Sequence, residues 1–250
     1  MSDTMAASQS LKDRVILVTG AGQGIGRAAA KAFAAEGATI ILLGRTTTKL
    51  EKVYDEILAE GGPMPAIFPM DLEKARDQDF ETLAQTIGYQ LHRLDGILHC
   101  AASFTRPTPL ELQEVDQWQN LFKVNTIAPF AINRACFPLL IAAPDASVIL
   151  VGESHGHEPK AYWGGFAVSK AALESYFRVQ ADEWEEHANL RINLVIPGPI
   201  NSTQRVLSHP GEAKDTLPQP EMFAAYLTRL MGPEGAGRRN QLIAWSKTLN

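Results

Sequence analysis

A glycine-rich turn is the most chemically informative feature of this 250-residue chain. It follows an apolar run and reads T-G-A-G-Q-G-I-G from Thr19 onward, ahead of an alanine-rich segment with a helical pattern. Glycine allows positive φ angles and close approach of a ligand, and the first turn of a helix offers free N–H groups to phosphate. The pattern therefore predicts a site for the pyrophosphate of a dinucleotide; a turn needed only for packing is the alternative. The residues expected there are Gly20, Gln23, Gly24, Ile25 and Gly26.

A basic residue at the end of the second apolar run indicates which nucleotide binds. An NAD site usually has an acidic residue about 20 positions after the glycines, where it binds the ribose 2′-hydroxyl. Here the run ends Leu43-Gly44-Arg45-Thr46, without Asp or Glu. Arg45 can contact a 2′-phosphate through two nitrogens, and Arg27 could flank that phosphate. We therefore expect NADP rather than NAD, with a solvated surface arginine as the alternative interpretation of Arg45.

Short apolar runs that alternate with longer helical stretches must position this turn. The runs begin near residues 14, 38, 65, 95, 147 and 191 and leave room for a crossover helix between successive runs. They are apolar throughout, as expected for parallel strands that are covered on both faces. The sequence predicts an α/β protein: a single-domain Rossmann fold whose doubly wound parallel sheet is flanked by helices. Residues 1–10 are expected to form a flexible N-terminal tail and residues 11–250 the domain.

The segment 201–219 departs from this alternation because it holds prolines and mixed charges without clear periodicity. It follows the sixth predicted strand, at the edge where a doubly wound sheet binds its ligand. We expect either a mobile loop that covers the substrate or an ordinary surface loop with a short helix.

The glycine spacing T-G-x-x-x-G-x-G resembles that of the short-chain dehydrogenase/reductase family, and the resemblance extends from about residue 11 to about residue 231. It implies that Asp71 and Leu72 hold the adenine and that Lys170 binds the ribose. It also places Cys100-Ala101-Ala102 beside the cofactor, where the family has N-A-G. The family's P-G-x-I-x-T corresponds here to a segment with serine as its last residue, and the cofactor-binding residues expected in it are Pro197, Gly198, Ile200 and Ser202.

Two catalytic positions of the family are changed in this sequence. The resemblance implies a tyrosine acid/base four residues before Lys170 and, thirteen residues earlier still, a serine that holds the substrate oxygen; Phe166 and Glu153 stand there instead. The lysine and Asn125, which in the family anchors a water, are both present. Phenylalanine has no ionisable proton, and general acid–base assistance is typically worth about 10²- to 10⁴-fold in rate.

Nearby residues could compensate for the missing hydroxyls. Glu153 would face Lys170 if the loop keeps the family's path, so we expect an ion pair between them. Ser154 is adjacent to the serine position, and Tyr162, four residues before Phe166, is the favoured stand-in proton donor, although a packing role is more ordinary for it. The candidate catalytic set is Asn125, Glu153, Ser154, Tyr162, Phe166 and Lys170.

Histidines and cysteines around this loop suggest no further site. His155 and His157 follow Glu153 at a spacing of two, but no other ligands are evident, so no metal site is predicted. His155 is as readily interpreted as solvated. Cys100 is expected to be a small buried hydrophobe rather than a nucleophile.

Composition and charge exclude several classes of function. With 23 basic and 28 acidic residues the net charge is −5, so there is no general basic field to hold nucleic acid or an anionic membrane. No apolar run approaches the roughly 18 residues of a membrane span, and the first ten residues lack a secretory signal pattern. The expected partners are a small-molecule substrate and further copies of the chain, and the expected location is the cytoplasm. The family resemblance implies a homodimer or homotetramer built on the helices near residues 115–141 and 167–186.

Three functions remain open at this point, and the family resemblance favours the first. The first is an NADP-dependent short-chain oxidoreductase, acting on an unidentified carbonyl or alcohol, that has recruited a different proton donor. The second is an NADP-binding protein without dehydrogenase chemistry, either a sensor or a partner subunit. The third is a non-redox enzyme on the same scaffold, such as an isomerase, dehydratase or lyase, that uses Glu153 or a histidine. The fold alone does not choose among them, because function depends on the site.

Overall fold

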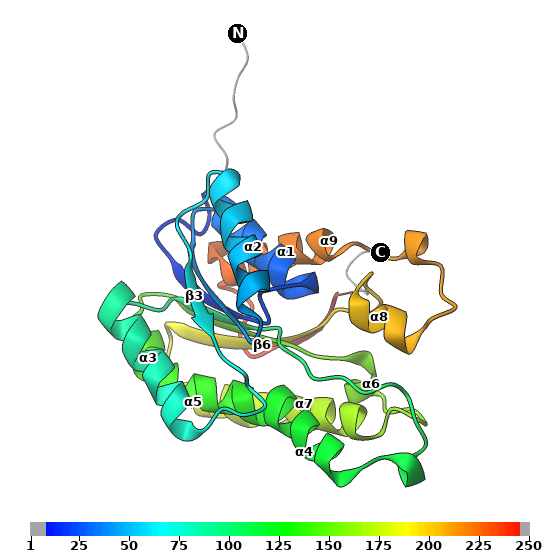
Figure 1. The fold of residues 1–250 in the computed structure, drawn as a ribbon. Helices are drawn as coiled ribbons and strands as arrows, with labels where there is room; N and C mark the ends of the chain where they lie inside the picture. Colours follow the sequence, from blue (N-terminus) through cyan, green and yellow to red (C-terminus); the bar gives the residue numbers. More distant parts are fainter. Residues whose placement is uncertain (1–8, 246–250) are drawn as a thin grey trace.

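A parallel sheet of seven strands forms the centre of the computed structural model, which describes residues 9–245 (Figure 1). The strand order is β3-β2-β1-β4-β5-β6-β7, and every pairing is parallel. The order reverses between β1 and β4, and this is the place where a doubly wound sheet opens its ligand crevice. The fold class and all six predicted strands are confirmed. The strands are β1 Val15–Thr19, β2 Thr39–Gly44, β3 Ala66–Pro69, β4 Gly96–His99, β5 Ala146–Val151, β6 Leu190–Ile196 and β7 Leu242–Ala244.

Helices cover both faces of this sheet. Figure 1 shows α1, α2 and α9 on one side and α3, α5 and α7 on the other. The helices are α1 Gly24–Ala35, α2 Thr47–Ala59, α3 Asp77–Leu91, α4 Val115–Phe122, α5 Ala128–Ala142, α6 Ser154–His157, α7 Gly164–Glu183, α8 Thr203–Ser208 and α9 Pro220–Met231.

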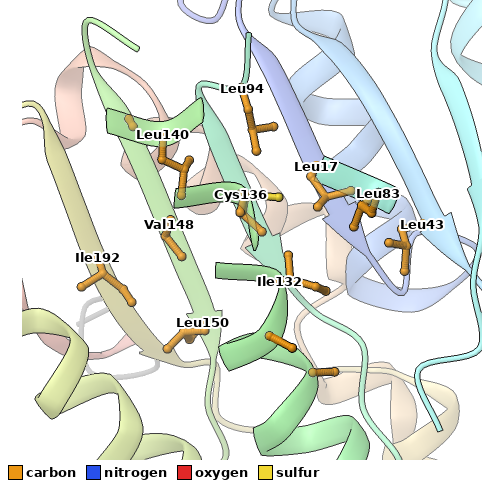
Figure 2. Close-up of a cluster of buried hydrophobic side chains, with 14 of the residues drawn as sticks. Leu17, Leu43, Leu83, Leu94, Ile132, Cys136, Leu140, Val148, Leu150 and Ile192 are labelled. Carbon is orange, nitrogen blue, oxygen red and sulfur yellow. The ribbon is translucent and has the colours of Figure 1, made fainter. Parts of the chain in front are cut away.

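Each strand contributes to two hydrophobic cores because successive side chains point to opposite faces of the sheet. On β1, Leu17 joins the core against α3, α5 and α7, whereas Ile16 and Val18 join the core against α1, α2 and α9. Figure 2 shows the first of these cores, in which Leu17 and Leu43 lie among side chains from the neighbouring strands and helices. Burial on both faces explains why the strands appear in the sequence as continuous apolar runs.

The long middle helix is continuous from Val115 to Ala142 but changes its winding over Lys123–Ile127, where it forms a π-helical segment. Single π turns of this kind are frequently found at functional sites. By length and apolar composition this helix could cross a membrane, which the sequence analysis did not foresee. Half of its most apolar stretch is buried, and it packs against α3 and α7, so it is a core helix of the domain.

Two predictions about irregular segments can be compared with the structure. The predicted tail falls mostly outside the described residues, and its last residue is not loose, because Ser10 donates to the Glu36 carboxylate from both its amide, at 2.9 Å, and its hydroxyl, at 3.0 Å. The segment 201–219 contains α8 and a 3₁₀ turn at Lys214–Thr216. Ser202 caps α8 by accepting a hydrogen bond from the Arg205 amide at 3.2 Å.

Candidate functional site

The glycine turn has a backbone that requires glycine at two positions. Gly20 and Gly24 have φ angles of 68° and 54°, in the left-handed region. A Cβ atom at Gly20 would lie 2.8 Å from the Cα of Ala101, whereas one at Gly24 would meet nothing within 4 Å. Gly20 is therefore needed for close packing of the turn, and the open space at Gly24 is where a ligand can approach the chain. Gly26 packs against the carbonyl of Gly20 and serves the packing of α1 on the turn.

A hollow of about 410 Å³ lies in front of this turn. Helix α1 begins at its edge without a side-chain hydrogen bond from the N-cap residue and without an acidic residue in its first turn, so neither a cap nor a negative charge competes with an anion there. These features fit a pyrophosphate group. The predicted cofactor residues that line this hollow are Gly20, Gln23, Gly24, Ile25, Arg45, Asp71, Leu72, Cys100, Ala101, Ala102 and Ser202.

Basic side chains stand at the outer end of the hollow. The Arg45 side chain is 71% exposed, and its nearest charged partner is Glu73 at 3.8 Å. Lys49, which the sequence analysis missed, also lines the hollow, and its Nζ donates to the Gln23 side chain at 2.6 Å. The expectation that Arg27 flanks the same site is wrong, because its guanidinium binds Glu56 on α2 at 2.7 Å and does not line the hollow.

The loop after β4 forms one wall of this hollow and is fixed by a hydroxyl. The Oγ1 of Thr19 accepts hydrogen bonds from the amides of Cys100 and Ala101, both at 3.1 Å. Burial raises the pKa of the Cys100 thiol to about 12, so the thiol stays protonated at neutral pH. A protonated thiol is a poor nucleophile, which supports the interpretation of Cys100 as a small hydrophobe.

A second hollow of about 310 Å³ adjoins the first. The two hollows lie next to one another at the carboxyl ends of the strands, because five residues line both; these are Ile25, Cys100, Ala102, Ser202 and Gln204. Besides the shared residues, the predicted site residues that line the second hollow are Glu153, Ser154, Phe166, Lys170, Pro197, Gly198 and Ile200. Of the predicted site residues, Gly26, Asn125 and Tyr162 line neither hollow.

Lys170 is held by the main chain rather than by an acid. Its side chain is buried, and its Nζ donates to the carbonyl of Val151, the last residue of β5, at 2.9 Å. The predicted ion pair with Glu153 is wrong: within the described residues Lys170 has no carboxylate oxygen within 4.0 Å, and Glu153 binds His155 instead. Burial lowers the pKa of the Lys170 ammonium, and the negative charge of Glu153 opposes that shift without cancelling it.

Asn125 connects the π segment to two other parts of the chain. Its Nδ2 donates to the hydroxyl of Ser169 at 2.9 Å and to the carbonyl of Ser103 at 3.0 Å, and its Oδ1 accepts from the amide of Ser103 at 2.8 Å. Ser169 precedes Lys170 on α7. Asn125 therefore fixes α7 and the loop after β4 relative to one another, although its own side chain does not line the hollows.

Phe166, at the position where the family resemblance implies a tyrosine, has a fully buried ring. It lies edge-on to Phe104, with ring centroids 5.0 Å apart, and 6.0 Å from Trp163. Tyr162 is 61% exposed and has a left-handed backbone with φ 74°; its carbonyl accepts from the Thr108 amide at 2.8 Å. The structure thus leaves Tyr162 largely exposed to solvent and packs the Phe166 ring among other aromatic side chains.

Glu153 and His155 form a pair that the sequence analysis did not assemble. The Nδ1 of His155 lies 3.2 Å from the Oε1 of Glu153, and the imidazole stacks on Trp163 with ring centroids 3.6 Å apart and planes 10° apart. All three line the second hollow with Lys170. Burial alone would raise the pKa of Glu153, but the hydrogen bond from His155 and the charge of Lys170 outweigh it, so the pKa lies below its ordinary value. The spacing of two between acid and histidine was the available signal.

The segment after β6 closes the other side of the second hollow. His209 lies 6.5 Å from His155 and 5.9 Å from Trp163 between ring centroids, and its Nδ1 is 2.9 Å from the Ser208 hydroxyl. Arg205 donates two hydrogen bonds to the Glu212 carboxylate, from Nε at 2.5 Å and from Nη2 at 2.6 Å. Burial lowers the pKa of His209, and the nearby Arg205 charge adds to that effect. No group of three metal-ligating side chains occurs in the described part of the chain.

Comparison with known proteins agrees with this architecture. The model of the short chain dehydrogenase family matches residues 14–211. The uncharacterized oxidoreductase YciK of Escherichia coli K12 is 38% identical over 224 residues, which are 90% of this chain and 88% of that protein.

Solved structures are also similar over nearly the whole chain. A short chain dehydrogenase from Salmonella enterica serovar Typhi has a TM-score of 0.92 at 34% identity and covers 96% of this chain and 98% of its own. A protein from Escherichia coli CFT073, solved in complex with NADPH, has a TM-score of 0.90 at 37% identity and covers 94% of this chain and 98% of its own. The chain belongs to the short-chain dehydrogenase family.

Proposed function

We propose that the protein is an NADP-dependent oxidoreductase that interconverts a carbonyl compound and its alcohol. The observation that carries this proposal is that the two hollows are neighbours: a hollow in front of the uncapped α1 shares five lining residues with a second hollow, which is lined by Lys170 and a carboxylate–imidazole pair. The similar E. coli protein solved with NADPH supports NADP as the nucleotide.

The residues present fit such a cofactor along its whole length. The amide groups at Gly24 would hold the pyrophosphate, and Asp71 and Leu72 would hold the adenine. Arg45 and Lys49 would hold the 2′-phosphate. When bound, the nicotinamide supplies or accepts a hydride, and Lys170 and the segment from Pro197 to Ser202 would lie on its side, in the second hollow. Trp163 and Phe166, which line the second hollow, would give the substrate end a partly apolar wall.

Two measurements test this proposal. Titration of purified protein with NADPH and NADH, followed by nucleotide fluorescence, should show saturable binding with NADPH the tighter ligand. NADPH oxidation should then be measured against a panel of aldehydes and ketones, and NADP reduction against the matching alcohols. Turnover of one carbonyl–alcohol pair in both directions supports the proposal. Absence of nucleotide binding removes it.

A second function is favoured by one observation, the fully buried phenyl ring at Phe166. A protein that binds NADP without performing dehydrogenase chemistry, as a sensor or a partner subunit, needs no phenol at that position. Tight NADPH binding together with no turnover of any carbonyl in the panel would decide for this alternative.

We also propose that the protein assembles into a homodimer or homotetramer. Support comes from apolar side chains that stay exposed on α5 and α7, among them Phe130, Val168 and Val179. Multi-angle light scattering on the purified chain measures the mass directly, and a mass equal to that of one 250-residue chain would contradict this assembly.

A further inference from the structure

We propose that His155 is the residue that gives and takes the substrate proton in this site, and that Glu153 is the residue that positions it. This inference rests on the proposed oxidoreductase function. It assigns to an imidazole the task for which the family uses a tyrosine, at a position where this chain has Phe166.

The geometry leaves one ring nitrogen of His155 available. Its Nδ1 faces Glu153 at 3.2 Å, and Nε2 makes no hydrogen bond to any part of the chain that the structure describes. The side chain is 19% exposed and lines the same hollow as Lys170 and Phe166. Stacking on Trp163, at 3.6 Å between centroids, restricts the plane of the imidazole. A ligand in the hollow would therefore meet an oriented imidazole with a free nitrogen.

The carboxylate explains why the orientation suits proton transfer. A carboxylate that accepts from Nδ1–H fixes the tautomer and the orientation of an imidazole and stabilises its protonated form. Glu153 stays ionised at neutral pH because the His155 hydrogen bond and the Lys170 charge hold its pKa low in spite of burial. The pair is thus ready to hold a proton at Nε2 and to lose it to a developing oxyanion.

Other hydroxyls near the site are less suitable. Tyr162 is largely exposed and does not line the hollow. Ser154 lines it, but an aliphatic hydroxyl has no ionisation near neutral pH and needs a base beside it to exchange a proton. The charged and titratable groups around the pair are Lys170 from α7 and Arg205, His209 and Glu212 from the segment that contains and follows α8.

The proposed step is balanced for reduction of a carbonyl. The substrate carbon accepts a hydride, with its two electrons, from reduced nicotinamide, and the C=O double bond becomes a single bond. The substrate oxygen takes the proton from Nε2 of His155, which leaves a neutral imidazole that still donates Nδ1–H to Glu153. Solvent returns the proton to Nε2, so one carbonyl, one NADPH and one proton give one alcohol and one NADP⁺. Oxidation of the alcohol follows the same path in reverse, with Nε2 as the base.

Kinetics of three variants test the assignment with the carbonyl that the wild-type enzyme reduces. His155→Gln should lower the rate of the chemical step by about 10²- to 10⁴-fold while NADPH binding is unchanged. Glu153→Gln should lower it less, because the imidazole stays in place but loses the carboxylate that orients it. His157→Gln is the matched control; this exposed histidine lies on the same short helix, binds Glu174 and should leave both measurements unchanged.

A second readout needs no substrate and no nucleotide. Nitrogen-15 NMR of the imidazoles in the ligand-free protein should show His155 as the Nδ1–H tautomer when neutral, and Glu153→Gln should remove that preference. Retention of the wild-type rate by His155→Gln, or an Nε2–H tautomer in the wild type, overturns the role of His155 and leaves the oxidoreductase function standing. A wild-type protein that binds NADPH but reduces no carbonyl overturns the function itself, and the catalytic role with it, even if the tautomer is the expected one.

Discussion

The Nζ of Lys170 donates a hydrogen bond to the carbonyl of Val151 at 2.9 Å, so the buried ammonium of α7 is held at the end of β5 rather than by an acid. Its positive charge acts on Glu153, where it helps to lower the pKa of that carboxyl group. We propose that its second task is to meet the ribose of a nucleotide.

Lys170→Met should stabilise the ligand-free protein and weaken its binding of NADPH. Burial lowers the pKa of Lys170 in the folded protein, so the unfolded chain binds the proton more tightly. The charged lysine therefore destabilises the native state at every pH below the pKa that Lys170 has in the unfolded chain. Removing the buried charge should therefore raise Tm. Calorimetry and NADPH titration measure both effects, with the exposed Lys52→Met as control. A lower Tm would show that the bond to Val151 outweighs the buried charge.

Arg45→Ala should reduce discrimination between the two nucleotides. Loss of a charge-assisted contact to the 2′-phosphate is worth about 1.5–3 kcal/mol, or about ten- to a hundredfold in NADPH affinity, while NADH, which lacks that phosphate, should bind as before. Fluorescence titration of both nucleotides gives the ratio. Arg229→Ala, an exposed arginine on α9, is the matched control. Equal weakening of NADPH and NADH would contradict the assignment of Arg45.

Restoring the family's two hydroxyls should change which residue supplies the proton. The double variant Phe166→Tyr, Glu153→Ser places a phenol and a serine in the hollow that contains Lys170, and we expect turnover of the carbonyl substrate to rise. Turnover by the double variant should also be insensitive to His155→Gln, whereas the same substitution in the wild-type protein should strongly lower turnover. Steady-state rates of the double and triple variants decide this. If the triple variant falls as far as the single His155 variant does, the phenol is not reaching the substrate.

Asp145→Asn should destabilise the fold at the amino ends of the strands, opposite the site. Asp145 forms ion pairs with both Arg14 and Arg191, and the side chain of Arg191 is almost fully buried. Removing the carboxylate leaves the buried Arg191 charge without its counter-ion, which should lower the free energy of unfolding by about 3 kcal/mol. Urea denaturation at pH 7 measures the loss, and Asp55→Asn, on the surface of α2, should change stability by less than about 0.5 kcal/mol.

The same carboxylate gives the protein an acid limit. Burial opposes ionisation of Asp145, but the hydrogen bond from Arg14 and the charge of Arg191 together hold its pKa below 3.8. A depressed folded pKa contributes stability that is present above pH 3.8 and is lost as the pH falls through the folded value. Wild-type stability should therefore fall more steeply below about pH 4 than that of Asp145→Asn, in which this contribution is already absent. Parallel acid titrations of the two proteins would contradict this account.

The sheet could be predicted from the sequence because its strands are buried on both faces, which leaves runs such as Ile40–Leu43 apolar at every position. The glycine turn could also be predicted from the sequence, since Gly20 and Gly24 need backbone angles that other residues rarely adopt. The lining of the two hollows followed from these elements, because parallel strands bring their carboxyl ends to one edge.

Side-chain pairing was not predictable in the same way, because it depends on contacts between elements far apart in the chain. Arg27 was expected at the nucleotide but finds Glu56 on a neighbouring helix, and Lys49 takes the place beside the turn. Glu153 was expected to bind Lys170, but a two-residue spacing brings the His155 imidazole to its carboxylate first. In each case the charge is satisfied by a partner that the sequence analysis did not indicate.

The π-helical turn at Lys123–Ile127 has a consequence for how the molecule can be altered. One additional residue in a helix rotates everything beyond it by about 100°. The two halves of the middle helix therefore present faces that are out of phase, and Asn125 stands at the point where the phase changes. Deleting a single residue there would remove the π turn and rotate α5 out of its packing against α3. It would also break the hydrogen bonds between Asn125 and Ser103, so the loss of one codon would detach the middle helix from the loop after β4.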